Sequence, residues 1–134
     1  ASLFNHPKIK MYVTATRGEG YGLPLIEAAV SGTPIVATGW SGHLQFLDKE
    51  KFGCVDYDLV EINESRVDGR IFEKGFKWAE PKSSSFKQQV KNVYEDYNTA
   101  KTKAREMMKQ VRTEFSKHSI ENQYNELFKR CIEK

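Results

Sequence analysis

The chain has 134 residues, a net charge of +3 and a mean hydropathy of −0.63, and 29% of its residues are charged. This length allows one domain at most, and no apolar run approaches the roughly 20 residues that a membrane-spanning helix needs. We therefore expect a cytoplasmic chain without a signal peptide, in which Cys54 and Cys131 stay free thiols. Most of the basic excess lies after residue 86, which suits an anionic partner.

The first part of the chain predicts a strand, a helix and a second strand. Residues 8–16 form a short, largely apolar run that is typical of a buried parallel strand. Residues 24–31 predict the crossover helix, with Pro24 at its first position and Gly32 just beyond its last. Residues 34–38 predict the next strand, so the unit is a right-handed βαβ crossover.

The middle of the chain predicts shorter elements. We expect a short helix over residues 42–48 and a strand over residues 52–56. Residues 57–77 show no convincing period and predict an irregular segment, with a hairpin or insert around residues 68–70. Residues 78–81 predict an extended segment.

The last part of the chain is expected to be helical. Ser85 and Gln88 have the spacing of a capping box that opens a helix, and residues 99–115 predict a second helix. Residues 119–134 predict a third helix with one apolar side. The first helix is expected to bury an aromatic and aliphatic face made of Phe86, Val90, Val93, Tyr94 and Tyr97.

A glycine-rich loop between the first strand and helix is the candidate site. Glycines at positions 18, 20 and 22 remove alternate side chains, so backbone amides can approach a ligand closely. We expect the amides of Leu23, Leu25 and Ile26 to point outward, unpaired, at the positive end of the helix dipole, where a phosphate binds well.

Two carboxylates flank this loop. Glu19 precedes the last two glycines, and Glu27, after seven intervening residues, is expected in the first turn of the helix. Carboxylate oxygens accept hydrogen bonds from vicinal hydroxyls of a ribose or a hexose. Together with phosphate-binding amides, this pattern favours a nucleotide sugar as ligand.

Three segments carry a resemblance to a known family. Residues 19–28, followed by residues 32–38, resemble the E-x7-E motif of retaining glycosyltransferases of family 4, which have the GT-B fold. Residues 39–47 resemble the next block of the same enzymes, and residues 77–81 resemble their "WAEP" segment. The chain departs from the pattern at Lys82, where relatives often carry Asp.

The resemblance implies an α/β fold, a partial Rossmann-like domain with a short parallel sheet and a helical C-terminal part. It implies hexosyl transfer from a nucleoside diphosphate sugar to a hydroxyl of a glycan, lipid or other acceptor, with retention and without a metal or cofactor. By analogy, Glu19 acts at the donor sugar near the reacting centre and Glu27 holds the ribose hydroxyls. The remaining donor-binding residues that it implies are Gly20, Tyr21, Gly22, Leu23, Ser41 and Gly42.

The same resemblance covers only the later part of a GT-B C-terminal domain. We therefore expect residues 1–134 to be a single truncated domain, inactive alone and completed by an N-terminal GT-B domain. The helix over residues 119–134 is expected to cross to that domain. A lipid acceptor would place the protein at a membrane surface.

Two other functions stay open from the sequence. The first is a different enzyme on the same fold, such as an epimerase or a phosphorylase. The second is a non-catalytic domain that binds polyanions through the basic helices after Lys87, although no specific nucleic-acid partner is expected. Trp40 is either a cleft-lining or a core residue, and His43 is expected to be a surface or cap residue.

Overall fold

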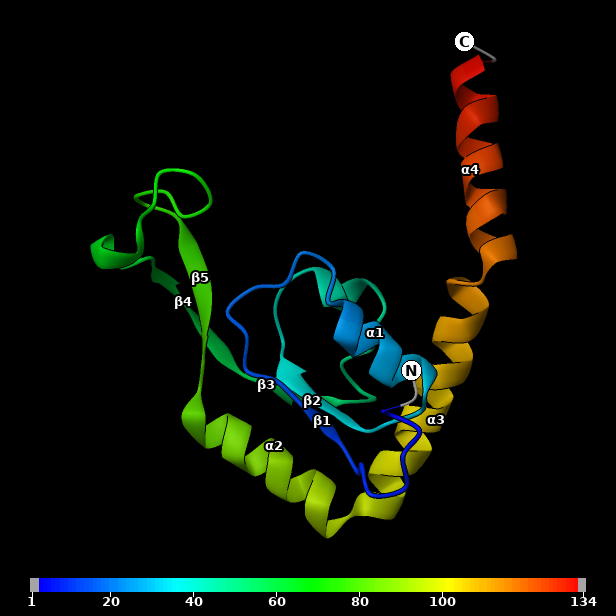
Figure 1. Cartoon of the computed structure of the whole chain (residues 1–134), viewed down its shortest axis with the longest axis horizontal. Helices are drawn as coiled ribbons and strands as arrows, with labels where there is room; N and C mark the ends of the chain where they lie inside the picture. Colours follow the sequence, from blue (N-terminus) through cyan, green and yellow to red (C-terminus); the bar gives the residue numbers. More distant parts are fainter. Residues whose placement is uncertain (1–2, 133–134) are drawn as a thin grey trace.

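The computed structural model describes residues 3–132 and has an α/β fold (Figure 1). Its main sheet has three parallel strands in the order β1-β2-β3. These are β1 (Tyr12–Val13), β2 (Ile35–Thr38) and β3 (Gly53–Val55). The expected partial Rossmann-like fold with a short parallel sheet is therefore confirmed, although β1 is much shorter than the predicted strand.

The central strand β2 is buried on both faces, as parallel strands in α/β proteins usually are. Ile35 and Ala37 pack in one cluster with α1 (Leu23–Val30) and α3 (Tyr97–Glu114). Val36 points the opposite way and packs with Val55 and Val93, the latter on α2 (Ser83–Glu95). Alternate residues of one strand thus hold helices on both faces of the sheet.

The crossover helix α1 ends as its sequence predicts. Gly32 has a φ of 64° and donates its amide to Ala29 at 2.9 Å, and Thr33 donates to Ala28 at 3.0 Å. This pair of bonds is a Schellman motif with glycine at C′. It turns the chain sharply into β2.

A hairpin projects from the body beside the sheet (Figure 1). Its strands β4 (Tyr57–Glu61) and β5 (Lys77–Pro81) are antiparallel, with Leu59 opposite Ala79. The expected extended segment over residues 78–81 is confirmed, whereas the irregular segment begins only after Glu61 because residues 57–61 pair with β5. It includes a short 3-10 helix, η2 (Glu64–Arg66).

The hairpin tip contains the turn that was expected at residues 68–70. Gly69 has a φ of 68°, and the Asp68 carboxylate accepts hydrogen bonds from the amides of Arg70, Ile71 and Phe72 at 2.9–3.0 Å. These bonds lower the pKa of Asp68, since they favour its charged form.

The start of α2 differs from the prediction. The helix begins at Ser83, and the hydroxyl of Ser85 accepts the amide of Asp56 at 2.9 Å, so Ser85 does not cap the helix. Lys82 precedes the helix without a side-chain cap and pairs with Asp58 at 2.9 Å. Tyr94 was expected in the buried face but is 79% exposed.

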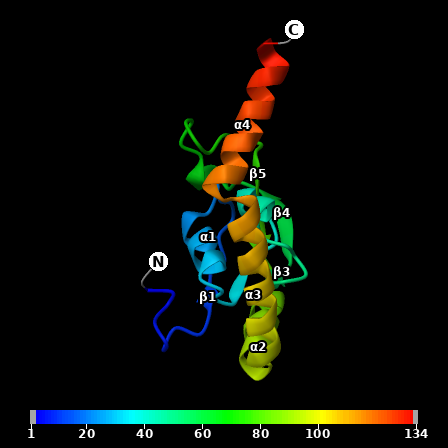
Figure 2. The same ribbon diagram turned by 90° about the vertical axis from the view of Figure 1, so that its right-hand side faces the viewer.

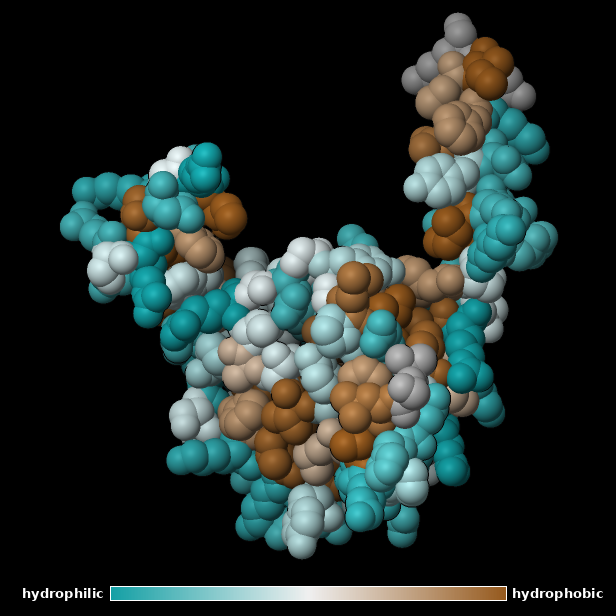
Figure 3. Space-filling view, viewed as in Figure 1, coloured by the Kyte–Doolittle hydropathy of each residue, from teal (hydrophilic) through white to brown (hydrophobic). Residues whose placement is uncertain are grey.

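The last helix, α4 (Lys117–Ile132), extends away from the body beyond α3, as Figures 1 and 2 show. Its predicted apolar side is exposed: more than half of the surface of Tyr124, Leu127 and Phe128 is accessible to solvent. In Figure 3 this side faces the hairpin across an open space. Within the described residues, no helix has the length and apolarity needed to cross a bilayer.

Candidate functional site

Two loops meet at the carboxyl edge of the parallel sheet, where α/β proteins usually bind ligands. The first loop (residues 17–22) leads from β1 to α1, and the second loop (residues 39–42) leads from β2 into η1 (Gly42–Gln45), a 3-10 helix. They lie between the hairpin and α4 in Figure 1. The short helix expected over residues 42–48 is therefore present in shorter form.

Hydrogen bonds to the backbone of Glu19 hold the two loops together. The hydroxyl of Ser41 donates to the Glu19 carbonyl at 2.6 Å and accepts from the Glu19 amide at 3.0 Å. The amide of Gly42 donates to the same carbonyl at 3.1 Å. Ser41 has a φ of 96°, and a non-glycine residue in such a region costs roughly 1–3 kcal/mol. The loop contact offsets this strain.

Glycine stands at positions 20, 22 and 42 of the site for different reasons. A Cβ on Gly42 would lie 2.0 Å from the carbonyl oxygen of Gly20, so the two loops approach too closely for a side chain. Gly22 has a φ of 84° and caps α1. A Cβ on Gly20, by contrast, would meet nothing within 4 Å. The protein needs Gly22 and Gly42 for its own packing, whereas the space beside Gly20 is open.

In the first loop Gly18, Gly20 and Tyr21 are exposed and Gly22 is buried, and Leu23 at the start of α1 is exposed. Within the described part of the chain, the amides of residues 20–23 donate no hydrogen bond. They are the groups that can bind an anion at the start of α1.

The prediction that the next amides are also unpaired is wrong. The amides of Leu25 and Ile26 donate to the carbonyl of Gly22 at 2.9 and 3.1 Å, because the cap residue already begins the helical bonding pattern. The anion-binding set is therefore confined to residues 20–23.

The two glutamates occupy different environments. Glu19 is half-buried in the first loop, where its backbone makes the bonds to the second loop. Glu27 is exposed on α1. Because the helix begins at Leu23, Glu27 lies beyond its first turn, which corrects the expected position.

His43 is a buried residue beneath the two loops, with only 1% of its surface exposed. The expectation of a surface or cap position is wrong, because the close packing at Gly42 draws the start of η1 into the body. Its Nε2 lies 2.8 Å from the carbonyl of Thr38, which can only accept, so we assign the hydrogen to Nε2. Nδ1 has no hydrogen-bond partner among the described residues.

Burial lowers the pKa of His43, because it disfavours the charged ring. The hydrogen bond to Thr38 and the nearby charge of Glu19 oppose this effect in part. The neutral ring is therefore the form that the fold prefers.

Aromatic side chains border the loops. Trp40 is 37% exposed, and its ring lies 5.4 Å from that of Tyr57 on the hairpin. Tyr21 is also 37% exposed and packs against buried Phe46 at 5.2 Å. Of the two alternatives for Trp40, the structure supports a position at the rim of the site rather than in the core.

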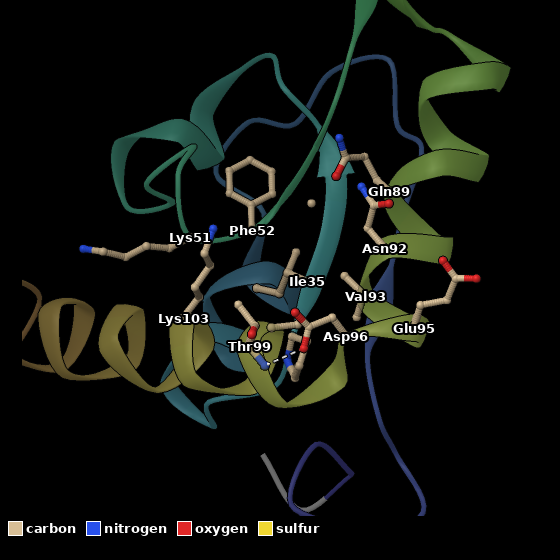
Figure 4. A pocket seen from close by; sticks show the side chains of 13 residues that line it. Ile35, Lys51, Phe52, Gln89, Asn92, Val93, Glu95, Asp96, Thr99 and Lys103 are labelled. Atoms are coloured by element: carbon tan, nitrogen blue, oxygen red, sulfur yellow. Dashed lines mark hydrogen bonds between the residues drawn. The ribbon is translucent and has the colours of Figure 1, made fainter.

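A cavity of about 400 Å³ lies at the opposite, amino edge of the sheet, between α2 and α3 (Figure 4). Neither Glu19 nor Glu27 lines it. Among its polar side chains, Lys51 is bound to Asp48 at 3.0 Å and to Gln110 at 2.9 Å. We therefore place the candidate site at the carboxyl edge.

The burial of His43 predicts a dependence of stability on acid. Well above pH 6.5 the ring is neutral in both the folded and the unfolded chain, and its full contribution to the free energy of unfolding is present. Below pH 6.5 the unfolded chain binds the proton first, because the folded-state pKa is lower, so stability falls. The loss is about 1.4 kcal/mol for each pH unit between the two pKa values.

The measurement is urea unfolding of the wild type and His43→Gln between pH 7.5 and 5. Gln keeps an N–H for the Thr38 carbonyl but does not titrate, so its stability should fall less steeply below pH 6.5. Parallel curves for the two proteins would contradict a buried, neutral His43.

The contact between the loops predicts a loss of stability for one glycine substitution and almost none for another. Gly42→Ala should lower the free energy of unfolding by about 1–3 kcal/mol, because its Cβ would overlap the Gly20 carbonyl. Gly20→Ala should change it by less than about 0.5 kcal/mol, because the space is open. Equal losses in urea unfolding would show that the loops are not packed as described.

Comparison with known proteins assigns the chain to a family. A family model described as "Family 4 Glycosyltransferase in conflict systems" matches residues 8–121, a span that contains both loops and both glutamates. No curated protein and no solved structure matches the chain. The chain belongs to the family 4 glycosyltransferases of conflict systems.

Proposed function

We propose that the carboxyl-edge site binds a nucleoside diphosphate hexose, and that the hexosyl group passes to an acceptor hydroxyl with retention of configuration. The observation that carries the proposal is the open space at Gly20 beside unpaired amides of residues 20–23. A loop that served only the fold would have no need for glycine at position 20. The family membership supports glycosyl transfer in general.

In our proposal the amides of residues 20–23, with the start of α1, bind the diphosphate. Negative charge develops on this leaving group, and fixed amides stabilise it without reorganisation. The bond from the anomeric carbon to the diphosphate breaks, and a bond to the acceptor oxygen forms. In our proposal the diphosphate itself takes the acceptor proton.

The carboxylates are assigned to the hydroxyls of the donor. Glu27, exposed on α1, binds the ribose, and Glu19, in the first loop, binds the hexose near the reacting carbon. A carboxylate accepts from two vicinal hydroxyls at once, which a neutral hydroxyl or amide does less well.

Ser41 and Gly42 contribute to donor binding indirectly in our proposal, by holding the backbone of Glu19. The Ser41 hydrogen is already donated to the Glu19 carbonyl, as is the amide of Gly42, so neither group is free to donate to a phosphate. We propose that both residues hold the first loop in its binding geometry. Contact with the donor then falls mainly to residues 20–23.

We propose that a second GT-B domain completes the enzyme and packs against the apolar side of α4. This side, which includes Tyr124, Leu127 and Phe128, borders the same open space as the two loops (Figure 3). A domain that covers it also lies over the donor and excludes water from the transfer. The acceptor binds between the two domains.

The assignment of Glu27 predicts a loss of donor affinity in Glu27→Gln. The amide replaces one acceptor oxygen with a donor group, so the dissociation constant should rise about tenfold, as for one hydrogen bond to a charged group. The measurement is calorimetric titration with UDP-glucose, GDP-mannose and ADP-glucose, followed by the tightest of these.

Glu126→Gln is a matched control, because it removes an exposed helical carboxylate outside the residues that the family model matches. Its affinity should equal that of the wild type. Gly20→Ala should weaken donor binding although the fold tolerates it. Binding of polyanions but of no nucleotide sugar would instead favour the non-catalytic alternative.

A further inference from the structure

The first residue of the first loop, Arg17, is held by three consecutive residues of β5. These are Trp78, Ala79 and Glu80, and they belong to the "WAEP" segment, to which the sequence assigns no role. Trp78 and Glu80 share one face of the strand, since successive side chains alternate.

Each of the three residues makes a different contact with Arg17. The amide of Ala79 donates to the Arg17 carbonyl at 3.1 Å. The guanidinium donates to both carboxylate oxygens of Glu80, from Nε at 2.5 Å and from Nη2 at 2.9 Å. Its Cζ lies 4.8 Å from the centre of the Trp78 ring. Backbone and side chain of Arg17 are therefore both fixed to the hairpin.

The three contacts together fix the orientation of Arg17 more firmly than any one of them would alone. Both side chains of the ion pair are about half exposed, and an isolated surface pair contributes little to stability. Here the pair is bidentate, which fixes the orientation of the guanidinium, and the aromatic ring restricts it further. The pairing lowers the pKa of Glu80, because the guanidinium of Arg17 favours the charged carboxylate.

The other strand of the hairpin contacts the second loop. Tyr57, at the start of β4, packs its ring against Trp40 at 5.4 Å. The base of the hairpin thus touches both loops of the candidate site.

We propose that Trp78 and Glu80 are positioning residues that act through Arg17 and hold the first loop in the geometry that binds the donor. The effect on donor affinity rests on the proposed function, whereas the effect on loop order does not. We call the contacts of Arg17 with Trp78, Ala79 and Glu80 the clamp. Losing the clamp should loosen residues 18–22 without unfolding the domain, because the core lies elsewhere.

The test is Glu80→Gln, studied by amide hydrogen exchange and by titration with the tightest-binding of UDP-glucose, GDP-mannose and ADP-glucose. Exchange of the amides of Glu19 and Gly42, which bond across the two loops, and of Ala79, which bonds to the Arg17 carbonyl, should rise about fivefold. The donor dissociation constant should rise by a similar factor, because the bidentate charge pair is lost. The thermal midpoint should stay within about 2 °C of the wild type, as for most surface substitutions.

Glu64→Gln is the matched control. It removes the Glu64–Lys74 ion pair of 2.9 Å in the segment between β4 and β5, and neither residue pairs with Arg17, Trp78 or Glu80. Exchange of the amides of Glu19, Gly42 and Ala79 should stay at the wild-type rate. Arg17→Lys, which keeps the charge but loses the planar, bidentate geometry, should behave like Glu80→Gln. Adding Glu80→Gln to Arg17→Gln should have no further effect.

Unchanged exchange in both Glu80→Gln and Arg17→Lys would overturn the proposal, as would equal loosening in Glu64→Gln. A wild-type protein that binds none of the three nucleotide sugars would refute the proposed function alone. The exchange measurement would then still decide whether the clamp exists.

Discussion

The site depends on the hydrogen bonds between Ser41 or Gly42 and the backbone of Glu19. They join two loops that leave adjacent parallel strands, and they require glycine at position 42 and a strained backbone at Ser41. Without them the first loop would be held only at its ends, by Arg17 at one end and by Gly22 at the start of α1 at the other. Strain that is held by surrounding contacts is common at functional sites, where it fixes a geometry in advance of binding.

These hydrogen bonds between the two loops explain the environments of the neighbouring residues. His43 follows Gly42 directly, so the close approach of the loops places its ring beneath them, bonded to Thr38 at the end of β2. Gly22 turns the chain into α1 and uses its carbonyl for the first helical bonds. What remains on the outer side is a short row of amides beside an open space.

Local patterns predict much of this architecture. The βαβ unit, the C′ role of Gly32 and the extended segment at residues 78–81 follow from periodicity and turn chemistry, and they are confirmed. The β4 strand and the bonds of Ser41 and Ser85 could not be read from sequence, because each depends on a partner distant along the chain. The buried position of His43 could not be read either, because it depends on the close approach of the two loops at Gly42. For the same reason the clamp on Arg17 emerges only from the structure: Glu80 is 63 residues away.

The central claim is that an anionic nucleotide sugar binds at the carboxyl edge of the sheet, and its most direct measurement is a two-dimensional amide NMR titration with UDP-glucose, GDP-mannose and ADP-glucose. The account predicts that one of them shifts the amides of residues 20–23, with smaller shifts in the second loop. The amides that line the cavity at the opposite edge, including Asn92 and Lys103, should not move. Shifts confined to that cavity, or none at residues 20–23, would contradict the account.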